Sequence, residues 1–391
     1  MSRPYAFVFM VAVLPVTAQD IFTDYSALED RFRLATNSIS IGVRFSGNSS
    51  ARFERLGTVA NSGDPGTLSE EQTRVYNDGY VSIDGRTTTE GSDLPDDGRT
   101  NTWGYSKADQ IMFDESGVAF HSYSSTSNGA SVDANSSLMT GVDIQYDRVF
   151  WKSRGRPISV PPALAFGVLL GCGLNDVNIK KRDSIRATLH TLTDTYSLLG
   201  SAVPVTPDAT EGYTAPSSVT ETLTNPDGTT TSYVIDTTTL LANQPESREE
   251  TSEENGAEIN GFWQVKGAYL TLRAGPWVRW QPTERLSFRF SAGASLSLLG
   301  LYMRYDERLQ LTSLSTEITA TEETEDKGYT MPGYFAGIDA EWWLTSRTSF
   351  FAGATYEDVT KKITLRSESE RTAAVTIATG LGARIGITTR F

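Results

Sequence analysis

The feature that most limits the possible folds of this chain is a strict alternation of apolar residues with small or polar ones. From Leu286 to Leu298 every second residue is apolar, and Ser, Arg and Gly occupy the positions between. Period two predicts a β-strand whose successive side chains point to opposite faces of a sheet. An ordinary strand has about five or six residues. This longer run, at ~3.3 Å per residue, is sufficient for a tilted strand to cross a hydrocarbon layer.

The same alternation recurs along the chain and divides it into eight candidate crossings. These segments are residues 38–46, 137–151, 162–179, 264–280, 285–306, 331–344, 348–366 and 373–391. Short connections at 152–161, 281–284 and 345–347 alternate with connections at 47–136, 180–263, 307–330 and 367–372, the last of which is also short. Tight turns on one side and loops on the other are typical of an up-and-down membrane barrel. We therefore predict an all-β fold, a transmembrane antiparallel β-barrel of eight strands with long external loops.

The two longest connections, 47–136 and 180–263, are rich in Ser, Thr, Asn, Asp and Gly. This composition predicts surface loops without a hydrophobic core of their own. Within the first loop, the stretches Arg74–Ile83 and Trp103–Tyr123 carry enough aromatic and β-branched residues to form hairpins. The hairpins either extend the barrel above the membrane or add crossings, which leaves ten or twelve strands as alternatives.

Residues 1–18 have the pattern of a secretory signal peptide. Arg3 provides the positive start, AFVFMVAVL the apolar stretch, and Val16-Thr17-Ala18 the small-residue cleavage site. Residues 19–36 then form a lead-in that we place in the periplasm, and the barrel with its loops occupies 37–391. The mature chain is therefore expected to leave the cytoplasm.

The composition argues against several classes of function. Asp and Glu number 48 against 34 Lys and Arg, so nucleic acid is not an expected partner. The single cysteine, Cys172, cannot form an intrachain disulfide. His121 and His190 are the only histidines, and we expect neither a metal site nor a cofactor. No G-x-S-x-G elbow is present, so we predict that the chain is not an enzyme.

Aromatic residues gather next to the short turns. The tryptophans that do so are Trp151, Trp277, Trp280, Trp342 and Trp343. Tryptophan and tyrosine favour the membrane–water boundary, where an apolar ring and a polar N–H or O–H are both satisfied. We therefore predict an aromatic girdle at this level. The aromatic residues expected at the opposite, outer boundary are Tyr302, Tyr305, Tyr334, Tyr356 and Trp263.

The C-terminal strand carries the most specific local pattern. Arg384 is followed two residues later by Gly386, and hydrophobic positions lead to the terminal Phe391. This strand resembles the signal read by the outer-membrane barrel assembly machinery, although Thr389 stands where a hydrophobic residue is usual. The chain as a whole resembles the small outer-membrane β-barrels of diderm bacteria, of the type of outer-membrane proteins A, X and W. The resemblance implies a location in the outer membrane, contact with its lipids and lipopolysaccharide, and delivery by the assembly machinery.

Charged residues on the inward face of the predicted strands are balanced, five of each sign. They are Arg44, Asp143, Asp147, Arg273, Arg279, Arg289, Asp339, Glu341, Glu357 and Arg384. The interior of an eight-stranded barrel holds only its own side chains, and an unpaired charge there would cost several kcal/mol. We therefore predict a lumen closed by ion pairs, with a narrow channel lined by the arginines as the alternative.

The function favoured by these observations is a structural or surface-interaction role, without an identified external ligand. A narrow passive channel is the first alternative and a lipid-modifying outer-membrane enzyme is the second. Acidic clusters such as Glu249-Glu250 and Glu253-Glu254 predict a solvated outer surface. Divalent cations that bridge these clusters to lipopolysaccharide are an alternative interpretation.

Overall fold

The computed structural model describes residues 35–391 except 48, 88–95, 137, 154–163, 205, 207–209, 312–316, 325–326, 359–360 and 378–379. The predicted signal peptide at 1–18 and almost all of the lead-in at 19–36 lie outside the described residues, as does most of the predicted turn at 152–161. None of the described helical segments is long and apolar enough to cross a membrane.

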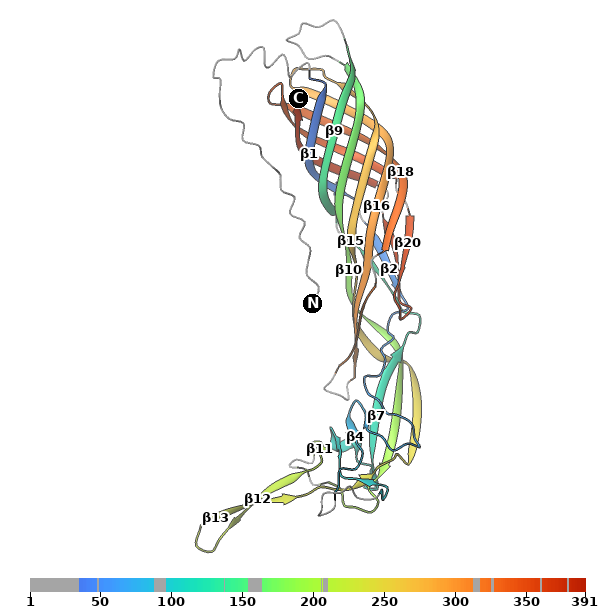
Figure 1. Ribbon diagram of the computed structural model, residues 1–391, viewed down its shortest axis with the longest axis vertical. Helices are drawn as coiled ribbons and strands as arrows, with labels where there is room; N and C mark the ends of the chain where they lie inside the picture. Colours follow the sequence, from blue (N-terminus) through green and yellow to red (C-terminus); the bar gives the residue numbers. More distant parts are fainter. Residues whose placement is uncertain are drawn as a thin grey trace.

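A ring of eight antiparallel strands forms the body of the molecule (Figure 1). The strands are β1 (Asn37–Ser46), β9 (Met139–Lys152), β10 (Leu164–Ser197), β15 (Ser247–Trp280), β16 (Leu286–Gln310), β18 (Lys327–Trp343), β19 (Thr348–Asp358) and β22 (Gly380–Arg390). Each pairs with the next along the chain, and β1 pairs with β22 to close the ring. The predicted eight-stranded barrel is confirmed. Closure leaves no strand edge exposed to lipid, which is the condition for β-structure to cross a bilayer.

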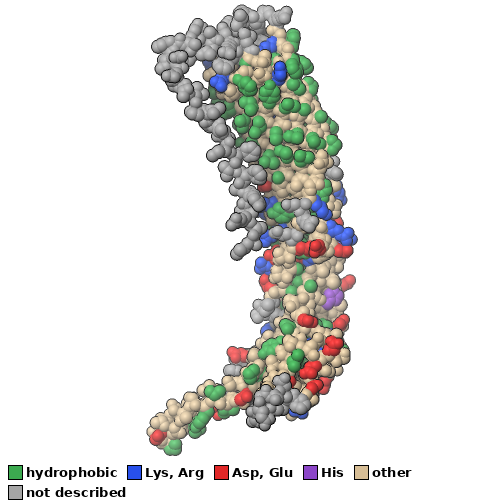
Figure 2. Space-filling view, in the orientation of Figure 1, with side chains coloured by type: hydrophobic (Ala, Val, Ile, Leu, Met, Phe, Trp, Pro, Cys, Tyr) green, Lys and Arg blue, Asp and Glu red, His purple; other side chains and the backbone are tan. Residues whose placement is uncertain are grey.

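The membrane-spanning half of the barrel is apolar outside and polar inside. Outward side chains such as Leu298 on β16 and Ile385 on β22 are exposed on the outer surface, whereas the inward Arg289 is fully buried. Figure 2 shows the resulting hydrophobic side chains on one face of this part of the barrel. Hydrocarbon accommodates apolar side chains, so the period-two pattern is strict on these strands.

Two strands continue far beyond the membrane. β10 and β15 have 34 residues each and pair with each other from Leu164–Trp280 to Thr195–Ser247. At ~3.3 Å per residue each spans roughly 110 Å, several times the length of a crossing. The predicted loop at 180–263 was therefore wrong in its limits, because the connection between these strands is only 198–246. Above the membrane the outward side chains meet water and become polar, so the apolar pattern fades before the strand ends.

A small sheet fills the outer mouth of the barrel. Its strands, in order, are β20 (Lys361–Arg366), β21 (Thr372–Ile377), β2 (Ser50–Glu54) and β8 (Ser131–Asn135). Phe53, Leu365 and Val375 from this sheet pack in one hydrophobic cluster with Val177 of β10 and Leu301 of β16. Above the membrane the interior is thus apolar and the exterior polar, the reverse of the arrangement below.

This sheet corrects the last two predicted crossings, 348–366 and 373–391. β19 ends at Asp358 and β22 begins at Gly380, while β20 and β21 between them form a hairpin of the small sheet. The sequence pattern continued without interruption because one face of that hairpin is also buried, with Ile363 and Ile377 in the same core. Alternation does not distinguish a strand that faces lipid from one that faces a neighbouring sheet.

The outer part of the chain folds into a separate module at the far end of β10 and β15 (Figure 1). β7 (Gly117–Thr126) pairs with β10, and β17 (Ile318–Glu323) extends the barrel sheet from β16. The smaller elements are β3 (Arg74–Val75), β4 (Gly79–Val81), β5 (Arg99–Thr100), β6 (Trp103–Tyr105), the 3-10 helix η1 (Ala108–Gln110), β11 (Tyr213–Thr214) and β14 (Leu241–Ala242). A projecting hairpin consists of β12 (Ser218–Thr224) and β13 (Thr230–Asp236).

The module has a hydrophobic core, contrary to the expectation from loop composition. Trp103, Phe120 and Tyr196 are fully buried and belong to one cluster with Tyr76 and Tyr213. The prediction failed because a few large aromatic side chains, spread thinly along two loops, are brought together by the long strands. The stretches Arg74–Ile83 and Trp103–Tyr123 contribute β3, β4, β6 and β7 to this module and are not additional crossings.

Candidate functional site

A ladder of ion pairs occupies the interior of the membrane-spanning half. The structure places all ten predicted charged residues inside the barrel, each at most 5% exposed. At the centre, Arg289 of β16 places Nη2 at 2.8 Å from Oδ2 of Asp339 on β18. Arg384 of β22 donates from Nε to the other oxygen, Oδ1, at 2.7 Å. Asp339 therefore joins arginines from two strands that are not neighbours in the ring.

Toward the outer side the ladder continues through alternating charges. Arg384 Nη1 lies 3.0 Å from Oδ1 of Asp143, and Asp143 also pairs with Arg273. Arg273 lies 3.7 Å from Glu357, which forms an ion pair with Arg44. Each carboxylate here lies beside at least one arginine, so the ion pairs offset part of the desolvation cost of these charges.

Toward the side of the short turns the ladder ends in a mixed polar and aromatic layer. Arg289 pairs with Asp147 and lies 3.9 Å from Glu341. Arg279 Nε lies 3.1 Å from Oε2 of Glu341. Ser287 donates its hydroxyl to the same carboxylate at 2.8 Å and accepts the indole N–H of Trp343 at 2.9 Å.

Two further lumen residues were not included in the prediction. Gln145 accepts a hydrogen bond from Arg384 Nη1 at 2.7 Å and donates one to Asp147 at 2.6 Å. The Arg390 guanidinium carbon lies 3.3 Å from the ring centroid of Trp343. Both share the inward parity of their charged neighbours on β9 and β22, so the strand pattern itself contained the signal.

The predicted aromatic girdle is only partly found at the lipid boundary. Trp151, Trp280 and Trp342 point outward and are 54%, 48% and 51% exposed. Trp277 and Trp343 are buried inside the barrel, so their assignment to the girdle was wrong. Their parity along the strand places them on the same face as Arg279 and Glu341, and Arg279 lies over the Trp277 ring at 4.9 Å. Proximity to a turn in the sequence does not determine which face a residue occupies.

The predicted outer boundary requires the same correction. Tyr334 and Tyr356 are exposed on the outer surface and lie beside each other. Trp263 and Tyr305 instead belong to the hydrophobic cluster inside the extended barrel. The prediction used only their distance along the strand from the short turns. Both residues lie on the inward face of their strands, and the barrel interior at that level is apolar, so they are buried there.

A second closure lies above the ladder. Besides the apolar cluster of the small sheet, the buried Arg371 donates from Nε and Nη2 to Oε2 of Glu307 at 3.0 and 2.7 Å. Glu307 also accepts the indole N–H of Trp263 at 2.8 Å and the backbone N–H of Gly57 at 3.1 Å. This carboxylate therefore ties β16, the loop after β2 and the turn between β20 and β21 together across the mouth.

Small cavities mark both ends of the ladder. One lies between Arg44, Tyr269 and Glu357, and the other between Lys152 and Arg279, and each has a volume of about 20 Å³. A cavity of this size accommodates about one water molecule. The packing is therefore close at the two levels where a conducting path would have to open.

The predicted assembly motif lies on β22, at the seam of the ring. Arg384 belongs to the ladder, and Phe391 is 53% exposed. Its backbone is held by hydrogen bonds to Asn37 at 3.0 and 3.3 Å. Gly386 faces Gly42 of β1, and a Cβ on Gly386 would lie 2.2 Å from the carbonyl oxygen of Ile41. Glycine at this position permits the first and last strands to approach.

Neither histidine lies in the membrane-spanning half. His121 Nδ1 contacts Oδ2 of the buried Asp78 at 2.6 Å, and the backbone N–H of His121 donates to Oδ1 at 2.7 Å. His190 contacts the hydroxyls of Thr126 and Ser252 at 2.7 and 2.8 Å. These contacts fasten a turn and a strand to their neighbours. Across the part of the chain that is described, no group of three His, Cys, Asp or Glu side chains is arranged to hold a metal ion.

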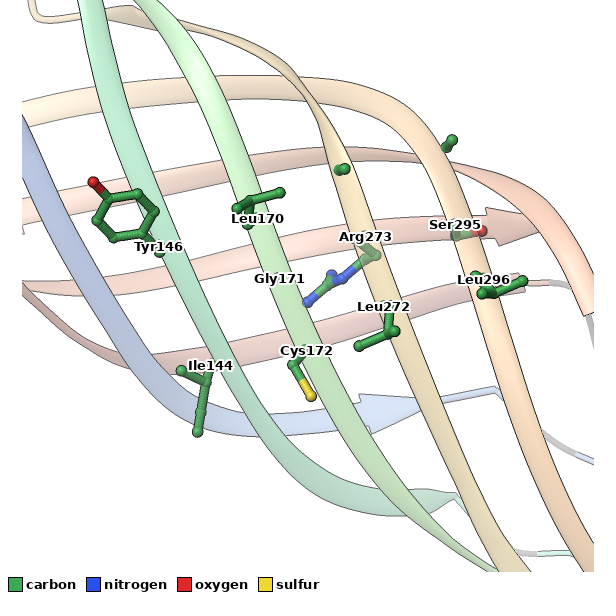
Figure 3. Close-up of a pocket in the computed structure, with 11 residues that line it drawn as sticks. Ile144, Tyr146, Leu170, Gly171, Cys172, Leu272, Arg273, Ser295 and Leu296 are labelled. Carbon is green, nitrogen blue, oxygen red and sulfur yellow. The ribbon is translucent and has the colours of Figure 1, made fainter. Parts of the chain in front are cut away.

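The lipid-facing surface carries an open groove of about 540 Å³ across β9, β10, β15 and β16. Figure 3 shows Leu170, Cys172 and Leu272 beside it, with the Arg273 guanidinium extending behind Gly171. The lining is almost entirely apolar, as expected of a surface covered by acyl chains. Cys172 is unpaired in a chain that has one cysteine.

An outward apolar band around a closed even-stranded ring, with charges confined to the interior, suits insertion into a bilayer. The chain therefore forms a closed β-barrel of the membrane-spanning kind. The barrel carries a large folded part beyond the apolar band, since β10 and β15 both extend for many residues past it.

Comparison with known proteins adds little to this barrel assignment. No protein-family model and no curated protein matches the sequence. Among solved structures, the outer membrane protease OmpT from Escherichia coli has 9% identity and a TM-score of 0.26, over 91% of this chain and 97% of OmpT. Ail, the attachment invasion locus protein of Yersinia pestis, has 8% identity and a TM-score of 0.23, over 90% and 99%. At these scores no activity is transferred from either protein.

Proposed function

We propose that this outer-membrane barrel is a surface-interaction protein whose closed barrel anchors a contact module outside the cell. The main observation in support of this proposal is the projecting hairpin of β12 and β13. It exposes apolar side chains to water at the far end of the module. Leu223, Tyr233 and Ile235 are 55%, 47% and 42% exposed, and Val234 is 73% exposed.

The hairpin suits contact with a protein partner for two reasons. By the strand register, Leu223, Tyr233 and Ile235 share one face of the two-stranded ribbon. An isolated two-stranded hairpin is only marginally stable, and exposed apolar side chains gain free energy when a partner covers them. Both edges of the ribbon also have backbone groups that can pair with an added strand.

The contacts that attach the module to the long strands support the same proposal. Asp194 of β10 is fully buried and receives Nε and Nη2 of Arg248 at 2.7 and 2.6 Å. The Tyr76 hydroxyl donates to Asp194 Oδ2 at 2.6 Å and lies 2.8 Å from the hydroxyl of Tyr196. Desolvation raises the pKa of Tyr196 to about 12 and also raises that of Tyr76, so both phenols stay protonated near neutral pH. This network joins the module to the long strands and supports the hairpin at a defined position.

The lumen geometry favours this function over a passive channel. Ion pairs fill the interior at the level of the membrane, and the Glu307–Arg371 contact and the apolar cluster lie above them. A solute would have to displace both layers. The histidine contacts described above likewise provide no observation in favour of a lipid-modifying enzyme.

The proposal is tested by adherence of bacteria that display the protein, measured on a surface coated with proteins of a target cell. We expect adherence to rise on expression of the native chain. It should fall to the level of the empty strain for the triple variant Leu223→Ser, Tyr233→Ser and Ile235→Ser.

A matched control carries Thr220→Ser and Thr222→Ser on the opposite face of the hairpin and should adhere like the native chain. Surface display of each variant is quantified with an antibody to a tag outside the hairpin. Adherence that is equal in all displayed variants would contradict the proposed role of the hairpin.

A further inference from the structure

A group of basic side chains faces outward just above the lipid-facing band, on three neighbouring strands. We call Lys180, Arg182, Lys266 and Arg304 the basic collar; all four side chains are exposed. The strand register brings them together, because Gln264 of β15 lies opposite both Lys180 of β10 and Arg304 of β16. Figure 2 shows Lys and Arg side chains where the hydrophobic zone ends.

Three of the four collar residues lie at the depth of lipid head groups, and Arg182 lies just beyond it. On β15 the outward side chains are apolar from Trp280 to Ala268, and the next outward residue is Lys266. Two residues of a strand tilted by about 45° rise about 5 Å, and the head-group layer is roughly 5–8 Å thick. Lys266 therefore lies at the hydrocarbon boundary, with Lys180 and Arg304 about 5 Å above it and Arg182 about 10 Å above it.

A groove of about 850 Å³ opens at the same place. Its floor is the outward face of β15, at Asn260, Phe262 and Gln264, and Arg182 and Arg304 contribute to its walls. The Arg182 guanidinium carbon lies 5.2 Å from the centroid of the Phe262 ring. The floor thus offers an aromatic face and amide groups beside fixed positive charges.

The acidic residues of the groove are placed at its outer end. Asp306 and Glu317 each lie 3.4 Å from Arg308, and Asp183 lies 3.4 Å from Lys181. Their charges are thereby engaged by arginine or lysine away from the membrane. At the end near the membrane, the exposed Lys180, Lys266 and Arg304 outnumber the exposed carboxylate of Asp176 on β10, although the whole chain has a net charge of −14.

We propose that the groove binds the phosphate-bearing head group of an anionic lipid in the outer leaflet. Phosphate oxygens accept hydrogen bonds from lysine and arginine at the depth of the collar. A sugar or glycerol portion of the head group lies on Phe262 and the amides. The acyl chains follow the apolar outer surface below, at Leu270 and Leu298. This site is distinct from the hairpin of the proposed function, so either proposal can fail without the other.

The experiment measures lipid binding to the purified full-length barrel in a non-ionic detergent, by native mass spectrometry. The probes are diphosphorylated lipid A and its monophosphorylated form. Inorganic phosphate is added as a competitor, to separate a lipid site from a free-phosphate site. We expect the diphosphorylated lipid to bind more tightly, and millimolar phosphate to compete weakly because it lacks the acyl chains.

Substitution of the collar then tests the residues. Each removed charge near an anionic surface should weaken binding roughly fivefold, so Lys180→Gln, Arg182→Gln and Lys266→Gln together should weaken it roughly a hundredfold. The matched control removes three exposed arginines of the mouth region, with Arg52→Gln, Arg55→Gln and Arg366→Gln, and should change affinity less than twofold. If the collar triple variant does not fold, Lys180→Gln and Lys266→Gln measured singly should each weaken binding roughly fivefold.

Two results would overturn the proposal. Equal weakening by the collar and control variants would mean that the lipid responds to overall charge. Unchanged affinity of the collar triple variant for both forms of lipid A would mean that the collar does not bind their phosphates. Raising the salt concentration should weaken lipid binding to the native chain and have much less effect on the collar variant.

Discussion

Replacement of Arg289 by methionine should reveal how strongly the ion-pair ladder stabilises the barrel. Arg289 is fully buried and contacts three carboxylates, those of Asp147, Asp339 and Glu341. After the substitution, Asp339 keeps Arg384 and Glu341 keeps Arg279. Asp147 loses its ion pair and retains the hydrogen bond from Gln145. Removal of one partner of a buried pair costs about 3–5 kcal/mol, and we expect a loss in this range.

A second substitution separates charge from packing. The double variant Arg289→Met with Asp147→Asn removes the carboxylate charge that was left without an ion pair. Because methionine fills much of the arginine volume and the asparagine amide still accepts from Gln145, the double variant should recover at least about half of the lost free energy. The exposed pair Arg52–Glu54, at 3.0 Å, provides the control, and Arg52→Met should cost less than about 1 kcal/mol.

The assay is reversible unfolding by guanidinium in phospholipid vesicles, followed by tryptophan fluorescence and by gel mobility of the heat-resistant barrel. Single-channel recording of the same samples provides a second measurement. Because the apolar cluster and the Glu307–Arg371 contact remain above the ladder, Arg289→Met should not produce a steady open pore. A cost below about 1 kcal/mol, or no recovery in the double variant, would refute the assignment of a stabilising ladder. A large conductance in the single variant would refute the second closure.

Three further outcomes are expected. Deletion of Phe391 should lower the amount of barrel that reaches the outer membrane but leave refolding in detergent near normal, and Thr389→Tyr should improve delivery. Equal losses in the delivery and refolding assays would mean that Phe391 is only a packing residue. A protease added to intact cells should cut the exposed turn at 225–229 and spare the turn at 281–284, and cleavage confined to the latter would invert the topology. The module should lose stability as the pH rises from 10 to 12, because the pKa of Tyr196 is about 12 in the folded state and that of an unfolded tyrosine is near 10. Protease resistance of the module that is unchanged up to pH 12 would contradict the burial of the Tyr196 hydroxyl.

The membrane-spanning part of this protein could be predicted from local pattern because the bilayer imposes a strict rule on each strand. Every outward side chain must be apolar and every inward one must fit a narrow polar interior, so parity alone placed Arg289, Asp339 and Arg384 in the lumen. The same rule would have placed Trp277 and Trp343 inside and added Arg390. Those errors arose where proximity to a turn was used in place of parity.

The pairing of charges and the whole upper half depended on tertiary structure. Asp339 forms an ion pair with Arg384 across the barrel. Strand tilt and register bring the two side chains together, and neither can be read from the sequence of a single strand. Above the membrane, water replaces lipid around the strands, so the apolar side chains turn inward and meet segments that are distant in the chain. Phe53 and Val375 form one core with Trp263 of β15 only because two connections, β1–β9 and β19–β22, return to the same mouth. A periodic pattern reports which face of a strand is buried, and the folded chain determines what covers that face.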